Sequence, residues 1–201
     1  MHFIQTQYTR LPVPATDYSG KTVIVTGANI GLGLEAARHF ARLGASKVIL
    51  GCRNAEKGEA AKQDIETTTG ARGVVEVWPL DLGSFDSVRD FCARAARLDR
   101  LDAVVENAGV ATGELEFMEG FESTITTNVV STFLLALLVL PVLRKTAARF
   151  NTTPRLVIVS SDAHALVRNA TGAPRDQGLL SFPLRTLDRG CASLYFANYL
   201  Y

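Results

Sequence analysis

Three glycines that follow a short apolar run could hold a phosphate group. The stretch from residue 26 to residue 33 reads TGANIGLG. Glycine lets the backbone turn tightly and approach a pyrophosphate, and the N-terminus of a following helix supplies N–H groups and a positive dipole. The spacing differs from the commoner G-x-G-x-x-G but predicts the same chemistry. We expect backbone contacts to a dinucleotide from Gly27, Gly31, Leu32 and Gly33.

A cationic residue at a second position predicts which dinucleotide is bound. Arg53 lies 20 residues beyond Gly33, after the second apolar run. An acidic residue there would hold the ribose 2′-hydroxyl of NAD, whereas an arginine accommodates the 2′-phosphate of NADP. No acidic residue adjoins Arg53, and Lys57 lies one turn along the next predicted helix. The sequence therefore predicts NADP.

Alternating strands and helices must position these residues. Apolar or β-branched runs occur at residues 23–25, 47–50, 74–78, 103–105 and 156–159. Stretches with helical spacing separate them, at residues 32–43, from the cap Asn54 to about residue 68, from the cap Ser84, and from Glu119 to about residue 149. The alternation predicts an α/β fold with a Rossmann-type doubly wound parallel sheet.

Composition excludes several classes of function. The 201 residues are 47% hydrophobic and 20% charged, with a net charge of +1, which indicates one globular domain and neither a nucleic acid nor an anionic membrane as partner. The three cysteines lack disulfide or metal-ligand spacing, so we expect reduced thiols, no metal site and a cytoplasmic location.

Two segments resemble targeting or membrane segments in part. Residues 1–20 contain no continuous apolar stretch, and Pro12 and Pro14 favour an extended N-terminal arm. Residues 129–143 are apolar, but they are too few for a membrane span and include Pro141. We expect a buried or interface helix there, which could also pair two copies of the chain.

Motifs after the later strands resemble those of the short-chain dehydrogenase/reductase family. TGANIGLG resembles its cofactor turn, Asp81-Leu82 its adenine-contacting pair, and Asn107-Ala108-Gly109 its NAG motif. The resemblance covers about residues 21–161, and Asp162-Ala163-His164 resembles the retinol-dehydrogenase-like subgroup. It implies adenine between Asp81 and Leu82, and Asn107 beside the adenine ribose.

The same resemblance implies catalytic roles. Ser161, in RLVIVSS, matches the serine that orients a carbonyl, and Asn128, in TTNVVSTF, matches the asparagine of the family's proton relay. Family members transfer a hydride between a nicotinamide and a carbonyl or alcohol. One departure is Glu106, where the family usually has asparagine or an apolar residue. A carboxylate buried there needs a partner or a raised pKa.

The general acid of the family has no clear counterpart. The family pattern Y-x-x-S-K uses a tyrosine, with a free pKa of about 10, and a lysine four residues on. One register puts Gly190 and Leu194 at these positions, a second Tyr195 and Tyr199, and a third Cys191 and Tyr195. None contains both residues, and the last lysine of the chain is Lys145.

The C-terminal run SLYFANYLY therefore looks like the first turns of a core helix in a truncated catalytic segment. The expected division is an arm at 1–20, an NADP-binding domain at 21–161 and a degenerate or truncated segment at 162–201, which leaves the sheet incomplete. Three hypotheses stay open: a defective or truncated reductase acting on a small carbonyl or alcohol, a catalytically dead nucleotide- or partner-binding module, and a reductase with residual activity.

Overall fold

A parallel sheet forms the centre of the computed structural model, which describes residues 15–161 and 193–199. Its strands are β1 Thr22–Thr26, β2 Lys47–Cys52, β3 Val75–Pro79, β4 Ala103–Glu106, β7 Arg155–Ser161 and β8 Ser193–Tyr199. They lie in the order β3-β2-β1-β4-β7-β8. The five predicted strands are confirmed with bounds shifted by one to a few residues, and so is the Rossmann-type α/β fold.

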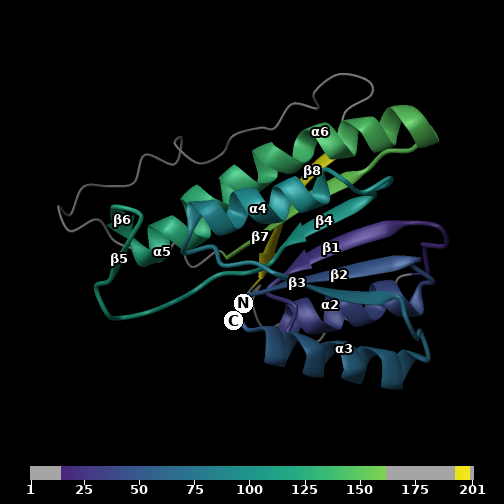
Figure 1. Cartoon of the computed structure of the whole chain (residues 1–201), viewed down its shortest axis with the longest axis horizontal. Coiled ribbons are helices and arrows are strands. Elements are labelled where there is room, and N and C mark those ends of the chain that lie inside the picture. The colour runs from purple at the N-terminus through teal and green to yellow at the C-terminus, as the bar shows by residue number, and fades with distance from the viewer. Residues whose placement is uncertain (1–14, 162–192, 200–201) are drawn as a thin grey trace, which may run out of the picture.

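Helices cover both faces of the sheet (Figure 1). α2 Gly31–Arg42 and α3 Ala55–Thr69 lie on one face, and α4 Phe85–Ala95 and α6 Thr132–Phe150 lie on the other. The predicted caps are confirmed, because the Asn54 side chain accepts the Lys57 N–H at 2.9 Å and the Ser84 hydroxyl accepts the Ser87 N–H at 3.4 Å. Each cap satisfies an N–H group that has no partner inside its helix.

Side chains of the central strands fill a core on each side of the sheet. Ile24, Ile49 and Val104 belong to the core beneath α4 and α6. Val23, Val25 and their neighbours belong to the core beneath α2 and α3. Strands buried on both faces are apolar throughout, which explains the continuous apolar runs of the sequence.

The strand order of the sheet has its switch point between β1 and β4, which are neighbours in space but not in sequence. β1 pairs with β2 on one side and with β4 on the other, with Val25 opposite both Leu50 and Val105. Strands β2 and β3 lie on one side of β1, and strands β4, β7 and β8 lie on the other. Open α/β sheets bind ligands at the carboxyl ends of the strands at such a switch point. The glycine turn follows β1 and the NAG motif follows β4, so both reach this place.

The predicted helix from Glu119 begins later than expected. A hairpin of β5 Phe117–Met118 and β6 Phe121–Glu122 precedes it, because Glu119 and Gly120 have φ values of 52° and 84°, which turn the chain. Helical structure follows in α5 Ser123–Ile125, in the π-helix η1 Thr126–Ser131 and in α6. The Glu122 carboxylate caps this stretch, and the N–H groups of Thr124 and Ile125 lower its pKa to about 2.

The expectation of a helix at the C-terminal run is wrong. Ser193–Tyr199 forms β8, which runs parallel to β7 with Ser193 opposite Arg155 and Tyr199 opposite Ser161. A short apolar run does not distinguish helix from strand by its spacing, and aromatic residues favour strands. β8 adds a strand beyond β7 and supplies backbone partners along that edge of β7.

The stretch Ser123–Phe150 is long and apolar enough to cross a membrane by length and composition alone. One face of it lies in the protein core, where Leu135, Val139 and Leu143 are fully buried. The opposite face exposes apolar side chains at a spacing of four residues: Ile125, Val129, Phe133 and Leu137. Self-association through this face stays a prediction.

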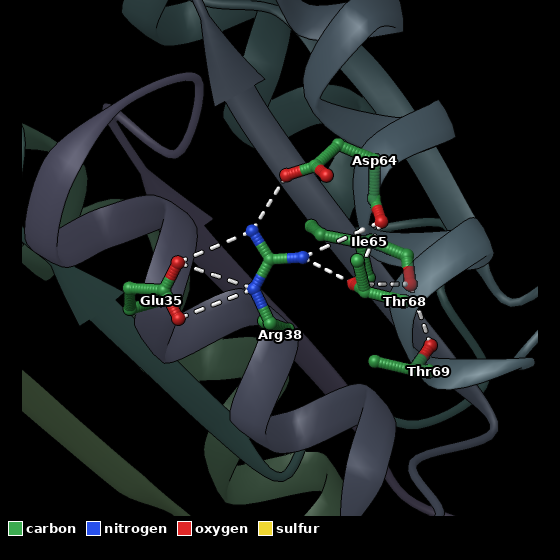
Figure 2. Close-up of polar contacts among 6 residues, drawn as sticks. All are labelled: Glu35, Arg38, Asp64, Ile65, Thr68 and Thr69. Atoms are coloured by element: carbon green, nitrogen blue, oxygen red, sulfur yellow. Dashed lines mark hydrogen bonds and ion pairs between the residues drawn. The ribbon is translucent and has the colours of Figure 1, made fainter.

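A buried arginine joins α2 to α3 (Figure 2). The Arg38 guanidinium donates to Glu35 on its own helix at 3.1 Å and to Asp64 on α3 at 2.6 Å. It also donates to the Thr68 hydroxyl. Asp64 and Glu35 hold the pKa of this guanidinium above its ordinary value through hydrogen bonds. These contacts fix α3, which follows Arg53, against α2, which follows the glycine turn.

Replacing Arg38 with methionine should lower the free energy of unfolding by roughly 1.5–3 kcal/mol, the contribution of a hydrogen bond to a charged group. The loss of stability stays in that range because the Glu35 and Asp64 side chains are half exposed, so water can solvate their carboxylates when the guanidinium is removed. Urea unfolding gives the value. Arg89→Met is the control, because the Arg89–Asp86 pair is exposed and should contribute under 1 kcal/mol. Equal effects of the two changes would contradict the role given to Arg38.

Candidate functional site

The glycine turn packs closely against the end of β4. Gly27 has a φ of +64°, and a Cβ atom there would lie 2.8 Å from the Ala108 Cα. A Cβ atom at Gly33 would lie 2.5 Å from the Asn107 side-chain nitrogen and 2.6 Å from the Gly27 carbonyl oxygen. Gly31 has a φ of +59° and no atom within 4 Å of that position. Close packing therefore requires glycine at 27 and 33, whereas backbone conformation favours it at 31.

Hydrogen bonds tie the NAG motif to the end of β1. The Thr26 hydroxyl accepts the backbone N–H groups of Asn107 and Ala108, both at 3.0 Å. The Asn107 side chain donates to the Thr26 carbonyl at 3.1 Å. The two turns at the switch point are therefore held as one unit. Thr26 was missed as a positioning residue, although a hydroxyl-bearing residue at the end of a strand was the available signal.

A cavity of about 310 Å³ opens beside this unit. It brings together four of the residues predicted to bind the cofactor, Gly27, Arg53, Asp81 and Leu82. They come from the ends of three neighbouring strands, β1, β2 and β3, as the topology requires. The end of β4 supplies a further wall through Ala108, Gly109 and Val110.

Two cationic side chains lie at the cavity. Arg53 and Lys57 both line it, and among the described residues neither side chain has a hydrogen bond or an ion pair. Asp81, which also lines it, is already engaged, since its carboxylate accepts the Gly83 N–H at 2.8 Å. The free positive groups therefore lie at the Arg53 side of the cavity, where an anionic ligand group would be stabilised.

Other predicted cofactor residues lie outside the cavity lining. Gly31, Gly33 and Asn107 build the unit behind it. Leu32 is 46% exposed and borders a separate hollow on the outer side of α2, together with His39 and Leu43. The backbone contact that we predicted for Leu32 stays a prediction.

The two predicted catalytic residues occupy different places. Asn128 lies in η1, and its side chain holds the chain after the NAG motif, accepting the Val110 N–H at 2.8 Å and donating to the Val110 carbonyl at 2.7 Å. Ser161 is the last residue of β7, at the carboxyl edge of the sheet. Its side chain, the motif Asp162-Ala163-His164, and Gly190 and Cys191 of the proposed catalytic registers lie outside the described part of the chain.

The hairpin contributes residues that the sequence did not predict. Glu116 and Met118 line the cavity, as do Ser123 and Thr127. The Glu119 carboxylate accepts the Phe85 N–H at 2.9 Å, which fastens the hairpin to the N-terminus of α4. The hairpin was missed because a helix was expected to begin at Glu119, and no motif in the sequence marked Glu116 or Met118.

The unusual residue Glu106 is buried. It is the last residue of β4, it is 3% exposed, and neither carboxylate oxygen has a hydrogen bond to any residue that the structure describes. Burial raises its pKa to about 9. Of the two expectations for a carboxyl group at this position, the structure therefore gives the raised pKa.

Comparison with known proteins identifies the motif set. The family model of the short chain dehydrogenases matches residues 21–173. The short chain dehydrogenase/reductase dmxR8 of Cryptosporiopsis is 54% identical over 167 residues, which are 82% of this chain and 52% of that protein. The short chain dehydrogenase FGM9 of Gibberella zeae is 48% identical over 81% of this chain and 48% of that protein. The chain thus spans about half the length of the curated relatives it matches.

Solved structures are similar as well. A short chain dehydrogenase of Escherichia coli in complex with NADPH is 32% identical, with a TM-score of 0.63, over 77% of this chain and 65% of that one. A Shigella flexneri short chain dehydrogenase in complex with NADP is 30% identical, also with a TM-score of 0.63, over 77% of this chain and 64% of that one.

Proposed function

This chain belongs to the short chain dehydrogenase family, an oxidoreductase family, and from this premise we propose that it binds NADP(H) in the cavity beside the glycine turn. The observation that carries the proposal is the pair Arg53 and Lys57, two cations that line the same cavity as Gly27 and have no side-chain partner within residues 15–161 and 193–199. Two similar solved structures are complexes with NADP or NADPH, which supports the same cofactor.

The residues present fit the parts of this cofactor. The turn Thr26–Gly33 and the N-terminus of α2 would receive the pyrophosphate. Arg53 and Lys57 would hold the 2′-phosphate by charge-assisted hydrogen bonds. Asp81 and Leu82 would flank the adenine, and Asn107 would hold the turn beside the adenine ribose. The bound nicotinamide would supply a hydride donor or acceptor.

Changing Arg53 to aspartate should reverse the cofactor preference. The unmodified chain is expected to bind NADPH roughly 10–100-fold more tightly than NADH, because each hydrogen bond to a charged group contributes about 1.5–3 kcal/mol. In Arg53→Asp the 2′-phosphate meets a negative charge, so NADPH should become the weaker ligand. Isothermal titration calorimetry gives both affinities for both proteins.

Arg72→Asp is the control for the charge change, because Arg72 lies in the turn before β3 and does not line the cavity. It should keep the preference of the unmodified chain. Equal affinity of the unmodified chain for NADPH and NADH would refute the proposed role of Arg53.

We further propose that the 201-residue chain binds the cofactor without efficient turnover. Ser161 would orient a carbonyl, but no register after it contains both the tyrosine and the lysine of the family pattern. Loss of a general acid alone typically lowers a rate by ~10²–10⁴-fold. NADPH oxidation with a panel of aldehydes and ketones should therefore stay at background. Turnover that disappears in Tyr195→Phe would show that Tyr195 acts as the acid and would contradict this expectation.

The second candidate function is a nucleotide- or partner-binding module without chemistry. The observation that favours it is the exposed apolar face of α5, η1 and α6, which offers a contact surface separate from the cavity. Turnover above background would exclude this candidate, whereas tight NADPH binding with turnover at background is the outcome that it shares with the defective reductase.

A further inference from the structure

We propose that Glu106 is a positioning residue for the nucleotide site, which holds the turn 107–109 in place only while its carboxyl group is uncharged and so sets an alkaline limit to NADP(H) binding. The inference rests on the proposed function. It concerns a buried group for which the family chemistry has no use, at a position where an acid is unusual.

The side chain of Glu106 faces the core beneath α4 and α6. Val104, two residues earlier on β4, belongs to that core, and alternate residues of a strand share a face. Ile158 on β7, the register partner of Glu106, belongs to the same core. Glu106 is therefore surrounded mainly by apolar side chains, and it has no hydrogen-bond partner among the described residues.

Few polar groups reach this layer. On α4, Cys92 is the titratable neighbour of Glu106. Burial raises the pKa of the Cys92 thiol to about 12, and the charge of Glu106 adds to that shift. On η1, Ser131 is fully buried, and its hydroxyl has no hydrogen-bond partner in the described part of the chain. It lies one turn before the core residue Leu135. β1 ends beside β4 in Thr26, whose hydroxyl is taken by the backbone of Asn107 and Ala108. No cation among the described residues contributes to the pKa shift of Glu106.

An ionised Glu106 would need water that this layer does not supply. The next residue along the chain, Asn107, starts the turn whose backbone is held by Thr26 and whose Ala108 lies against Gly27. That turn forms a wall of the cavity. Solvating the carboxylate would therefore require β4 to shift at its end, and the cavity wall moves with it.

The test compares NADPH affinity from about pH 7 to about pH 10 in the unmodified chain, in Glu106→Gln and in the control Glu114→Gln. Glu114 is exposed and lies outside the cavity lining, so the control makes the same chemical change without burial. With a pKa of about 9 for Glu106, the unmodified chain and the control should lose roughly tenfold more affinity than Glu106→Gln by pH 10. Identical profiles of all three proteins would overturn the positioning role.

Infrared spectroscopy of the ligand-free chain tests the charge state independently of NADPH. Exposed carboxylic acids are ionised at pH 7, so a protonated carboxyl band at that pH would come from a buried acid. The unmodified chain should show this band, lose it as the pH rises past about 9, and lack it in Glu106→Gln. No band at pH 7 would overturn the proposal. Failure to bind NADPH at any pH, with the band present, would instead refute the proposed function.

Discussion

Glu106→Gln is expected to raise the free energy of unfolding by roughly 3 kcal/mol at pH 7, because the buried carboxyl group must take up a proton on folding. The pKa of Glu106 is raised from 4.5 to about 9 in the folded chain. Neutral glutamine has a similar shape and needs no proton. The higher free energy of unfolding therefore comes from removing the cost of protonating Glu106, and not from a new contact.

The sign of the pH dependence follows from the two states. Between pH 4.5 and about 9 the folded chain holds a proton on Glu106 that the unfolded chain has released. Below pH 4.5 the protonation of Glu106 costs the folded chain no stability. As the pH rises from 4.5 toward 9, the free energy of unfolding of the unmodified chain decreases. The loss is about 1.4 kcal/mol per pH unit. The advantage of Glu106→Gln should grow with pH over the same window and level off above it.

Urea unfolding at several pH values measures this advantage. Glu114→Gln is again the control and should stay within about 0.5 kcal/mol of the unmodified chain at every pH, as exposed substitutions usually do. A Glu106→Gln variant that is less stable at pH 8 than the unmodified chain would mean that Glu106 is ionised and has a partner.

Gly27→Ala should abolish measurable nucleotide binding, with a loss of ~10²-fold or more in NADPH affinity, because two penalties of about 1–3 kcal/mol each act at one residue. The φ of +64° disfavours any side chain, and the new Cβ atom would lie 2.8 Å from the Ala108 Cα. Either the glycine turn or the NAG motif must move, and both border the cavity. Calorimetry with NADPH and urea unfolding report the two consequences.

Gly70→Ala separates the effect of conformation from that of contact. Gly70 caps α3 with a φ of +75°, and no atom lies within 4 Å of its Cβ position. This control should lose only about 1 kcal/mol of stability from the left-handed conformation and keep its NADPH affinity. Equal losses of binding in both variants would show that the close contact at Gly27 does not matter.

The sequence predicted those parts of the fold that local chemistry determines. Parallel strands buried on both faces appear as continuous apolar runs, and Asn54 and Ser84 mark helix starts because their side chains accept N–H groups. The convergence of Gly27, Arg53, Asp81 and Leu82 on one cavity follows from the strand order, because residues after neighbouring parallel strands meet at one edge.

The remaining parts depend on contacts between distant segments. The hairpin at Glu119–Gly120 is set by two left-handed residues, one of them not glycine, and its anchoring to Phe85 crosses 34 positions of sequence. β8 was mistaken for a helix because short apolar runs fit both structures and only its pairing with β7 decides. Asn128 was expected to take part in a proton relay. No local pattern could show that its side chain also forms hydrogen bonds with the backbone of Val110.

Arg53 and Lys57 should make the cavity a site for a 2′-phosphorylated adenosine. Calorimetric titration of the unmodified chain with adenosine 2′,5′-bisphosphate and with adenosine 5′-monophosphate tests it most directly, because the two ligands differ only in the 2′-phosphate and both avoid the nicotinamide end. The bisphosphate should bind at least roughly tenfold more tightly, a difference equivalent to about 1.4 kcal/mol. Equal affinities, or tighter binding of the monophosphate, would contradict it.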